Sequence, residues 1–470
     1  MSEPCITGVG VYTPRYRIDA GTIADAWGRF QGSGITEKHV AAADEDALTM
    51  GAAAAERALE AGETEPQAID ALVFASTTPP LAEEELTPKL AAFLGVGSAV
   101  HRSLGASTRA GTQAITAAVD AEASPALVVV ADCPQGEPNS PQEHAAGAGA
   151  VAFVLESDAS VGAGLRARAE YTADYPGTRF RERGETDVQG LGITSYDRQA
   201  FRECVTGAVS RLDLASEPDA LALQAPDGRL PARATRALDT SANLETVAEH
   251  RGDLGAASAP AALAQALTGG HQTVLTVGFG SGAGADALLV EGTAPVVSNL
   301  DRETVSIDYA QYLRLRGALD STPPAGGGAQ VSVPSWRRQR GARYRLEAGR
   351  CPACDAVAFP AEGACPDCLE LVEYERVRLS HRGSVETVTG VSPGGAPPEF
   401  AAQAERGGDF GVAIVEFPTL TGEGTASAPM QVTDGDPVSV AAGDVVEAVV
   451  RRIYTQEGVT RYGRKVRPAE

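Results

Sequence analysis

The stretch CPACDAVAFPAEGACPDC (Cys351–Cys368) separates a large N-terminal region of this 470-residue chain from a short C-terminal one, and its cysteines predict a metal site. It holds four of the seven cysteines, in two CxxC pairs separated by ten residues. Four thiolates at such a spacing can close tetrahedrally around one Zn²⁺, so we expect a structural site made of Cys351, Cys354, Cys365 and Cys368. A rubredoxin-like iron site would use the same ligands. Disulfides would need an oxidising compartment, and the N-terminal residues show no apolar signal-peptide core.

The region before this stretch predicts a large α/β body. Its first 295 residues alternate short apolar runs with alanine-rich helical stretches, the pattern of βαβ units. Strands are expected at Ile6–Val11, Leu72–Ala75, Ala126–Ala131 and Val151–Leu155, and helices at Asp46–Glu60, Pro88–Phe93 and Ala110–Ala121. A second series has a helix near Gln199–Ser210, a strand at Ala220–Leu223, a helix at Ala256–Leu267 and strands at Val274–Val277 and Ala287–Val290. These two halves predict an internal structural duplication.

The domain boundaries follow from the same patterns. We expect two halves of the body, a connector, a zinc ribbon and a C-terminal domain, at residues 1–160, 161–295, 296–345, 346–375 and 376–470. The connector contains the Pro/Gly-rich linker Ser321–Gln330. Alternating apolar residues after the ribbon predict a small five-stranded barrel of OB type, with a loop at Pro393–Asp409.

The composition limits the partners of the protein. A net charge of −23 disfavours nucleic acid, because a phosphate backbone requires a basic surface. No apolar run has the length of a membrane span, so we expect a cytoplasmic protein. Only three of the 39 basic residues are lysines, and such an acidic, lysine-poor surface is typical of a salt-rich cytoplasm. A GC-rich genome is the alternative explanation of the arginine bias.

Two local motifs have structural and functional interpretations. The string GFGSGAGADA (Gly278–Ala287) precedes a strand and not a helix, which excludes a dinucleotide fingerprint and favours a tight hairpin. Glycines there also permit close backbone approach to a ligand, so Gly280 and Gly282 are candidate ligand-binding positions. Ser107 and Thr108 precede a predicted helix, where N-capping is their ordinary role. The six histidines show no metal-ligand spacing.

Several separated segments resemble the archaeal-type hydroxymethylglutaryl-CoA synthases of the thiolase superfamily. They are Glu37–Leu59, Val128–Glu156, Ala225–Pro231 and Val277–Ala287. The ribbon with Ala358–Pro360, and the closing segment Arg451–Pro468, resemble a second family of small acyl-CoA-associated proteins. Those consist of a rubredoxin-like zinc ribbon and an OB barrel. The resemblance implies a duplicated five-layer α/β/α/β/α body, followed by the ribbon and barrel, with a coenzyme A thioester as ligand or substrate.

The resemblance also implies a catalytic set that this chain does not carry. Such synthases use a cysteine that accepts an acetyl group, a glutamate as general acid/base, a histidine and a later asparagine. The matching positions here hold Thr108, Thr77, Gln224 and Asp253. A threonine hydroxyl is a far weaker nucleophile than a thiolate unless a base activates it. Arg229 matches a basic family position and is a candidate partner for a coenzyme A phosphate.

Four functions stay open at this level. The first is a catalytically silent acyl-CoA-binding scaffold or subunit, which acts beside an acetoacetyl-CoA thiolase or an active synthase. The second is a cysteine-independent retro-aldol lyase on 3-hydroxyacyl-CoA, for which Asp253 and Asp227 are candidate carboxylates. The third is an active hydroxymethylglutaryl-CoA synthase, and the fourth is a structural adaptor unrelated to coenzyme A. The superfamily implies a homodimer or a larger complex.

Overall fold

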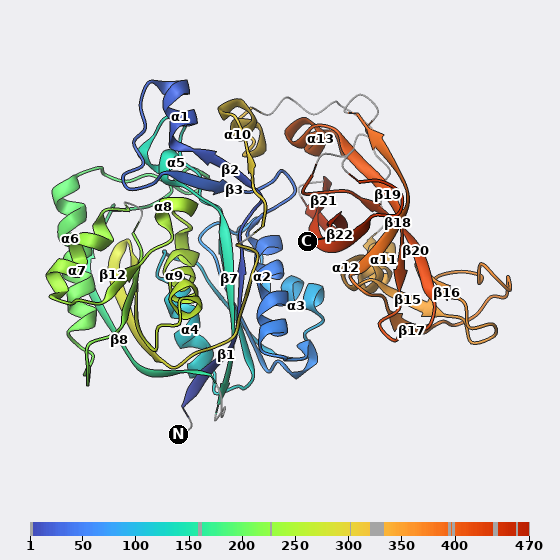
Figure 1. Cartoon of the computed structure of the whole chain (residues 1–470), viewed down its shortest axis with the longest axis horizontal. Coiled ribbons are helices and arrows are strands. Elements are labelled where there is room, and N and C mark those ends of the chain that lie inside the picture. The colour runs from blue at the N-terminus through green and yellow to red at the C-terminus, as the bar shows by residue number, and fades with distance from the viewer. Residues whose placement is uncertain are drawn as a thin grey trace. The chain divides into compact units, whose positions relative to one another are not determined.

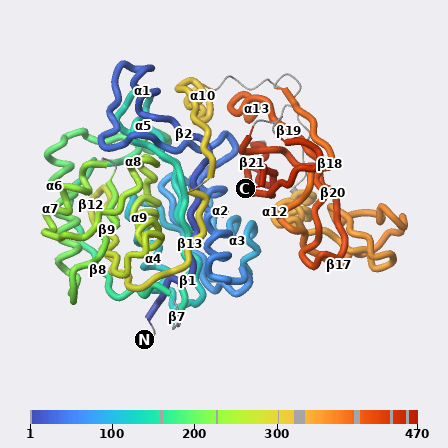
Figure 2. Tube along the Cα trace, in the orientation of Figure 1, coloured from blue at the N-terminus to red at the C-terminus, as the bar shows by residue number. Residues whose placement is uncertain are grey.

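The computed structural model describes residues 3–157, 162–225, 228–300, 302–319, 333–392, 396, 400–435, 440–456 and 459–469. The chain folds into two compact units, whose path can be followed in Figure 2. The first unit consists of Met1–Ala41, Asp46–Ala91 and Val96–Tyr312. The second consists of Ala42–Glu45, Ala92–Gly95 and Leu313–Glu470.

The first half of the body forms a five-stranded arrangement. Its strands are β1 (Pro4–Tyr12), β4 (Ala71–Ala75), β5 (Val100–Leu104), β6 (Ala126–Asp132) and β7 (Gly149–Ser157). They lie in the order β5-β4-β6-β7-β1, with β4 parallel to β5 and β6, and β7 antiparallel to β6 and β1. All residues of β4 and β6 are buried, which explains why every residue of these strands except Asp132 is apolar.

The second half repeats this arrangement strand for strand. It contains β8 (Ala163–Tyr175), β9 (Ala220–Leu223), β10 (Asn243–Glu245), β11 (Thr273–Gly280) and β12 (Gly282–Glu291). Their order is β10-β9-β11-β12-β8, with the same relative directions as in the first half. A short antiparallel pairing of β1 with β8 joins the halves into one 11-stranded sheet, in which β13 (Val296–Ser298) lies beside β1. The predicted duplication is confirmed.

Helices complete a five-layer body (Figure 1). Helices α4 (Ala110–Asp120) and α9 (Ser258–Thr268) contact each other between the two halves of the sheet. The outer faces carry α2 (Ala47–Ala61) with α3 (Thr87–Leu94), and α6 (Thr194–Val209) with α7 (Leu230–Leu238). Helix α9 is buried on nearly every side, and its alanine-rich sequence is what such a central position requires.

Smaller elements surround one end of this body. Strands β2 (Tyr16–Asp19), β3 (Glu37–Val40) and β14 (Val305–Ser306) form a separate sheet in the order β14-β2-β3. The short helices of the first unit include α1 (Ala20–Trp27), α5 (Pro141–Ala145) and α8 (Ala248–Arg251), and 3-10 turns cover Pro66–Ala68 and Gly255–Ala257. Helix α10 covers Tyr309–Leu315.

The second unit combines a small ribbon sheet with a larger antiparallel sheet. The ribbon strands are β15 (Glu347–Arg350), β16 (Val357–Ala358) and β17 (Glu375–Arg378), preceded by α11 (Val333–Arg338) and α12 (Arg340–Arg345). The larger sheet contains β18 (Arg382–Val391), β19 (Phe410–Pro418), β20 (Thr425–Gln431), β21 (Val445–Gln456) and β22 (Val459–Pro468), in the order β20-β19-β18-β21-β22. A bridge between Val432 and Val466 nearly closes it. The five predicted strands are present.

Two local predictions are corrected by the structure. Ser107 and Thr108 do not cap α4, because the N-cap residue is Arg109 and no side chain bonds to the free amides. Part of the predicted loop Pro393–Asp409 is helical, since α13 covers Ala401–Gly407. The predicted linker Ser321–Gln330 lies outside the described residues.

Candidate functional site

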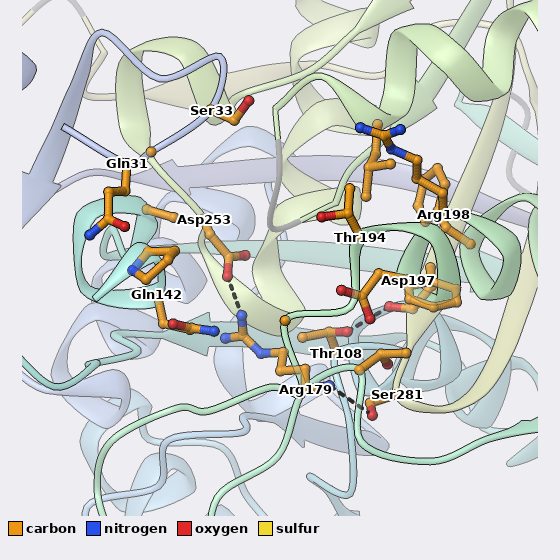
Figure 3. A pocket seen from close by; sticks show the side chains of 18 residues that line it. Gln31, Ser33, Thr108, Gln142, Arg179, Thr194, Asp197, Arg198, Asp253 and Ser281 are labelled. Atoms are coloured by element: carbon orange, nitrogen blue, oxygen red, sulfur yellow. Dashed lines mark hydrogen bonds and ion pairs between the residues drawn. The ribbon is translucent and has the colours of Figure 1, made fainter. Parts of the chain in front are cut away.

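A cavity of about 300 Å³ lies where the two halves of the body meet (Figure 3). Thr108 comes from the start of α4 in the first half, and Phe279 comes from the β11–β12 hairpin in the second. Asp197 stands in the first turn of α6. The remaining polar lining side chains belong to Gln31, Ser33, Gln142, Thr178, Arg179, Thr194, Arg198, Asp253 and Ser281. The duplicated fold therefore builds one site from segments that are far apart in sequence.

Thr108 is held by the hairpin opposite it. Its hydroxyl donates a 2.6 Å hydrogen bond to the carbonyl oxygen of Phe279. The hairpin can come this close because Gly280 has no side chain: a Cβ there would lie 2.4 Å from the Ser107 hydroxyl. Neither Gly280 nor Gly282 lines the cavity, whereas Ser281 between them does. The predicted hairpin is present. The lack of a side chain at Gly280 allows the hairpin to pack closely against the residues that precede α4.

A buried ion pair fixes the start of α4 against β12. The Arg109 guanidinium donates to both carboxylate oxygens of Asp286, with Nη2–Oδ1 and Nε–Oδ2 distances of 2.5 and 3.1 Å. The Thr112 hydroxyl donates to the same carboxylate at 2.9 Å. Both charged side chains are about nine-tenths buried, so this network sets where Thr108 stands in the cavity.

Asp253 lies in the cavity and forms an ion pair with Arg179. Its other carboxylate oxygen accepts hydrogen bonds from the amide of Gly255 at 3.0 Å and the hydroxyl of Ser258 at 3.3 Å. The amide of Arg179 donates to Ser281 at 3.0 Å, which anchors the arginine to the hairpin. One nitrogen of its guanidinium, Nη2, is buried and has no hydrogen-bond partner among the described residues. Figure 3 shows this guanidinium directed toward Asp253 inside the cavity.

Asp197 is a second carboxylate of the same cavity, and no sequence motif pointed to it. Figure 3 places it on the α6 side, with Thr194 and Arg198. Its Oδ1 atom is buried and has no hydrogen-bond partner among the described residues. Burial raises the pKa of this carboxyl above its ordinary value. Asp197 is therefore a proton acceptor that faces the cavity without a competing bond at Oδ1.

Two of the four family positions lie away from the cavity. The hydroxyl of Thr77 donates to Asp132 at 2.7 Å, and this buried carboxylate also accepts bonds from Ser76, Thr78 and the amide of Ala256. Gln224 is 5% exposed and bonds locally, to the carbonyl of Ala225 and the hydroxyl of Thr246. Of the four predicted positions, the structure brings together only Thr108 and Asp253.

Arg229 stands next to the cavity. It is the N-cap residue of α7, its side chain is exposed, and the following residue, Leu230, lines the cavity. The amide of Gly228 donates to the carbonyl of Ser33 at 2.9 Å, which fixes this turn against the opposite wall. Asp227, the other carboxylate considered from sequence, lies outside the described residues.

Two of the three cysteines of the body, Cys133 and Cys204, are poor nucleophiles. Burial raises the pKa of Cys133 to about 12, and Asp46 and Asp132 add to the effect. Burial also raises the pKa of Cys204, which lies in the hydrophobic core between α6 and the sheet. Neither residue lines the cavity. Both thiols therefore stay protonated at neutral pH.

The four clustered cysteines meet as predicted. Their sulfur atoms all lie within 4.8 Å of one another, with 3.8 Å between Cys351 and Cys368 and 3.6 Å between Cys354 and Cys365. Tetrahedral zinc with Zn–S bonds of about 2.3 Å requires sulfur–sulfur distances of ~3.8 Å, so the arrangement fits a structural zinc ion. A hydrogen bond from the amide of Cys368 lowers the pKa of Cys365 to about 7, whereas desolvation and the neighbouring sulfurs raise the pKa of Cys354 to about 12, so zinc binding must displace thiol protons.

Within the part of the chain that the structure describes, no helix combines the length and apolar composition needed to cross a bilayer.

Comparison with known structures and families identifies the fold of the body and the type of ribbon domain. The chain is similar to an HMG-CoA synthase complexed with CoA, at a TM-score of 0.59 and 16% identity over 70% of this chain and 94% of that one. It is also similar to 3-oxoacyl-(acyl carrier protein) synthase III, FabH, from Pseudomonas aeruginosa PAO1, at a TM-score of 0.56 and 21% identity over 63% and 100% of the two chains. The body therefore has a thiolase-like fold. Residues 338–372 match the ChsH2 rubredoxin-like zinc ribbon domain.

Sequence relatives name the family more closely. A hydroxymethylglutaryl-CoA synthase of Pyrobaculum neutrophilum is 30% identical over 345 residues, which cover 67% of this chain and 98% of the relative. One from Methanopyrus kandleri is 30% identical over 344 residues, covering 67% and 97%. The chain belongs to the hydroxymethylglutaryl-CoA synthase family, and it carries a zinc ribbon and an antiparallel sheet in addition to the shared body.

Proposed function

We propose that the protein binds an acyl-CoA thioester in the Thr108 cavity without forming an acyl-enzyme, and that it acts as a scaffold or subunit. The observation that carries this proposal is the hydrogen bond from the Thr108 hydroxyl to the backbone carbonyl of Phe279. A carbonyl oxygen cannot take up the proton, so the acceptor that holds the Thr108 hydroxyl is not a base that would activate it. The thiols of Cys133 and Cys204 do not replace it, because burial raises the pKa of each.

Binding of coenzyme A is supported by relatives and by local chemistry. A similar solved structure is described as an HMG-CoA synthase complexed with CoA. Arg229 stands beside the cavity and offers a guanidinium to a phosphate group. The ribbon and the five-stranded sheet would then hand the acyl-CoA to a partner, an acetoacetyl-CoA thiolase or an active synthase. We expect the body to form a homodimer or a larger complex.

The test combines binding with mass measurement. The full-length protein is titrated with acetyl-CoA by calorimetry, and its intact mass is recorded after incubation with excess acetyl-CoA. We expect saturable binding with no mass increase for the native protein. A Thr108→Cys variant should gain an acetyl group, and a Thr112→Ser variant, in the helix that follows Thr108, is the control that should not. A covalent acetyl group on the native chain would refute the proposal and favour an active synthase.

A cysteine-independent lyase on 3-hydroxyacyl-CoA is the second candidate, and Asp197 favours it. In this reaction a base removes the proton of the 3-hydroxyl group, and the C2–C3 bond breaks to release an aldehyde or ketone. The electron pair stays on C2 as the thioester enolate, which then takes a proton back. The partnerless Oδ1 of Asp197 suits the base, and the buried Nη2 of Arg179 suits the enolate oxygen.

This candidate is tested on a panel of 3-hydroxyacyl-CoA esters, by following release of the carbonyl product. Asp197→Asn should lower the rate by about 10²–10⁴-fold, the usual contribution of a general base. Asp213→Asn, an exposed aspartate outside the cavity, is the matched control. Lack of cleavage across the panel, or equal rates for native and Asp197→Asn protein, would exclude the lyase and leave the binding function standing.

A further inference from the structure

A second cavity of the first unit is strongly basic. Its volume is about 310 Å³, and it shares no lining residue with the Thr108 cavity. Four guanidinium groups and two imidazoles line it, against a single carboxylate. They belong to Arg15, Arg17, Arg251, Arg302, His39, His250 and Glu37. This excess of positive charge is local, because the chain as a whole carries a net charge of −23.

The one carboxylate does not neutralise these arginines. Glu37 forms an ion pair with Arg17. Arg251 has no ion pair or side-chain hydrogen bond among the described residues, and burial alone lowers its pKa to about 10. The Nε atoms of Arg15 and Arg17 are buried and have no hydrogen-bond partner in the described part of the chain. Buried donors without acceptors are costly, and a bound anion would supply the acceptors that the described residues do not.

The backbone around this cavity is fixed before any ligand enters. The amide of Thr13 donates to the side-chain oxygen of Asn299 at 2.9 Å, and the Asn299 amide group donates to the Thr13 carbonyl at 2.8 Å. The amides of Val305 and Ile307 donate to the carbonyls of Arg15 and Arg17, at 2.9 and 3.0 Å. These bonds join the loop before β2 to the residue after β13, and β2 to β14, and so fix the backbone that carries Arg15 and Arg17.

Strand β3 and the end of α8 supply further basic side chains of this cavity. Arg17 and His39 are direct partners in the antiparallel pairing of β2 with β3. The Nδ1 atom of His39 lies 2.7 Å from the carbonyl of Pro14, which can only accept, so Nδ1 carries the hydrogen. Arg251 is the last residue of α8. The guanidinium groups therefore converge from three separate segments on the same volume.

We propose that this cavity binds a small multivalent oxyanion of the diphosphate type. The planar guanidinium group donates two parallel hydrogen bonds to phosphate oxygens, and several such groups around one cavity match a ligand with two adjacent anionic centres. A monovalent anion would leave most of these donors unused. The repulsive field of the whole chain opposes anions elsewhere on the surface, so binding at this place depends on the local arginines.

The test is calorimetric titration of the full-length, zinc-loaded protein with magnesium-free inorganic pyrophosphate at low ionic strength. We expect saturable binding at one site per body, and weaker binding of orthophosphate and citrate. Arg251→Gln and Arg15→Gln should each weaken pyrophosphate binding by roughly 10–100-fold, the effect of losing a charge-assisted hydrogen bond. Arg168→Gln, an exposed arginine paired with Asp120, is the matched control.

Three results would overturn the inference. One is the lack of saturable pyrophosphate binding, and another is unchanged affinity in both arginine variants, provided that their melting temperatures are close to that of the native protein. The third comes from titrating coenzyme A into Arg251→Gln: equal loss of coenzyme A and pyrophosphate affinity would mean that the two ligands share one site. Unchanged coenzyme A binding together with lost pyrophosphate binding would support a separate site, whether or not the Thr108 cavity functions as proposed.

Discussion

Replacing Arg109 by methionine should strongly destabilise the first unit. The change removes both hydrogen bonds of the guanidinium to Asp286 and leaves a carboxylate whose side chain is only 7% exposed. Breaking a buried pair in this way costs about 3–5 kcal/mol. The remaining bond from Thr112 to Asp286 offsets about 1 kcal/mol of it. Glu170, the second partner of Arg109, is 72% exposed and adds little. We therefore expect a loss of about 2–4 kcal/mol.

The chain offers a selective reporter for this measurement. Its two tryptophans lie in different units, Trp27 in the first and Trp336 in the second. In a Trp336→Phe background, urea unfolding followed by fluorescence reports on Trp27, whose ring lies 5.9 Å from that of Tyr309. Arg168→Met is the control for an exposed arginine, and it should cost less than about 1 kcal/mol.

A double variant distinguishes two causes of the stability loss, the unpaired buried charge of Asp286 and the lost contacts of Arg109. Asp286→Leu combined with Arg109→Met removes both charges, and replacement of a buried pair by apolar side chains is often neutral or stabilising. The double variant should therefore recover at least half of the stability lost by Arg109→Met alone. The reasoning is refuted if Arg109→Met costs less than about 1 kcal/mol, or if the double variant is no more stable than the single one.

Three further predictions follow from single features of the two units. Cys365→Ser should lose the bound zinc, measured as metal released per chain, whereas Cys133→Ser should retain it; equal zinc content in both would contradict a four-cysteine site. Asp197→Asn should raise the melting temperature at pH 7, because burial raises the pKa of Asp197 and its ionisation therefore destabilises the folded state. This gain should shrink as the pH falls through the raised folded-state pKa, because the carboxyl then takes up a proton, and a gain that does not depend on pH would show that burial is not the cause. Gly111→Ala should destabilise the first unit by about 1–3 kcal/mol or more, because the new Cβ would lie 2.0 Å from the carbonyl oxygen of Ala256. Gly97→Ala, where a Cβ meets no atom within 4 Å, should leave stability nearly unchanged.

Sequence patterns located the buried strands well because those strands are apolar throughout. The range Ala220–Leu223 coincides with β9, and Ala126–Ala131 lies one residue short of β6. The missed strands have different sequences. In β8, exposed and half-buried residues alternate from Arg166 onward, and the edge strand β5 has the polar sequence VHRSL. A strand with a solvent-exposed face, such as β8, or at a sheet edge, such as β5, needs few consecutive apolar residues, so an apolar-run criterion does not detect it.

The candidate site could be predicted only in part, because much of its chemistry lies in segments without a motif. The spacing of the four cysteines alone predicts their site, because the two cysteines of each CxxC pair lie close in sequence. Arg179 and Asp197 instead reach the cavity from the segment after β8 and the first turn of α6. Arg179 and Asp197 lie near Thr108 only because the two halves of the body pack together, and the spacing of residues in the sequence does not predict that packing.

The hydrogen bonds in and near the cavity explain why the proposed chemistry uses residues other than those at the family's catalytic positions. The side chains of Thr77 and Thr108 use their hydroxyl protons on acceptors within the protein, Asp132 and the Phe279 carbonyl. Gln224 is likewise occupied by local bonds. In contrast, Asp197 and Arg179 each have a buried polar atom that forms no hydrogen bond with a described residue. Groups whose bonds are satisfied internally stabilise the fold, whereas unsatisfied buried groups acquire their partners from a ligand. A ligand in this cavity should therefore change the ionisation of Asp197 more than that of any group at the family's catalytic positions. For this reason the lyase test uses an Asp197 variant.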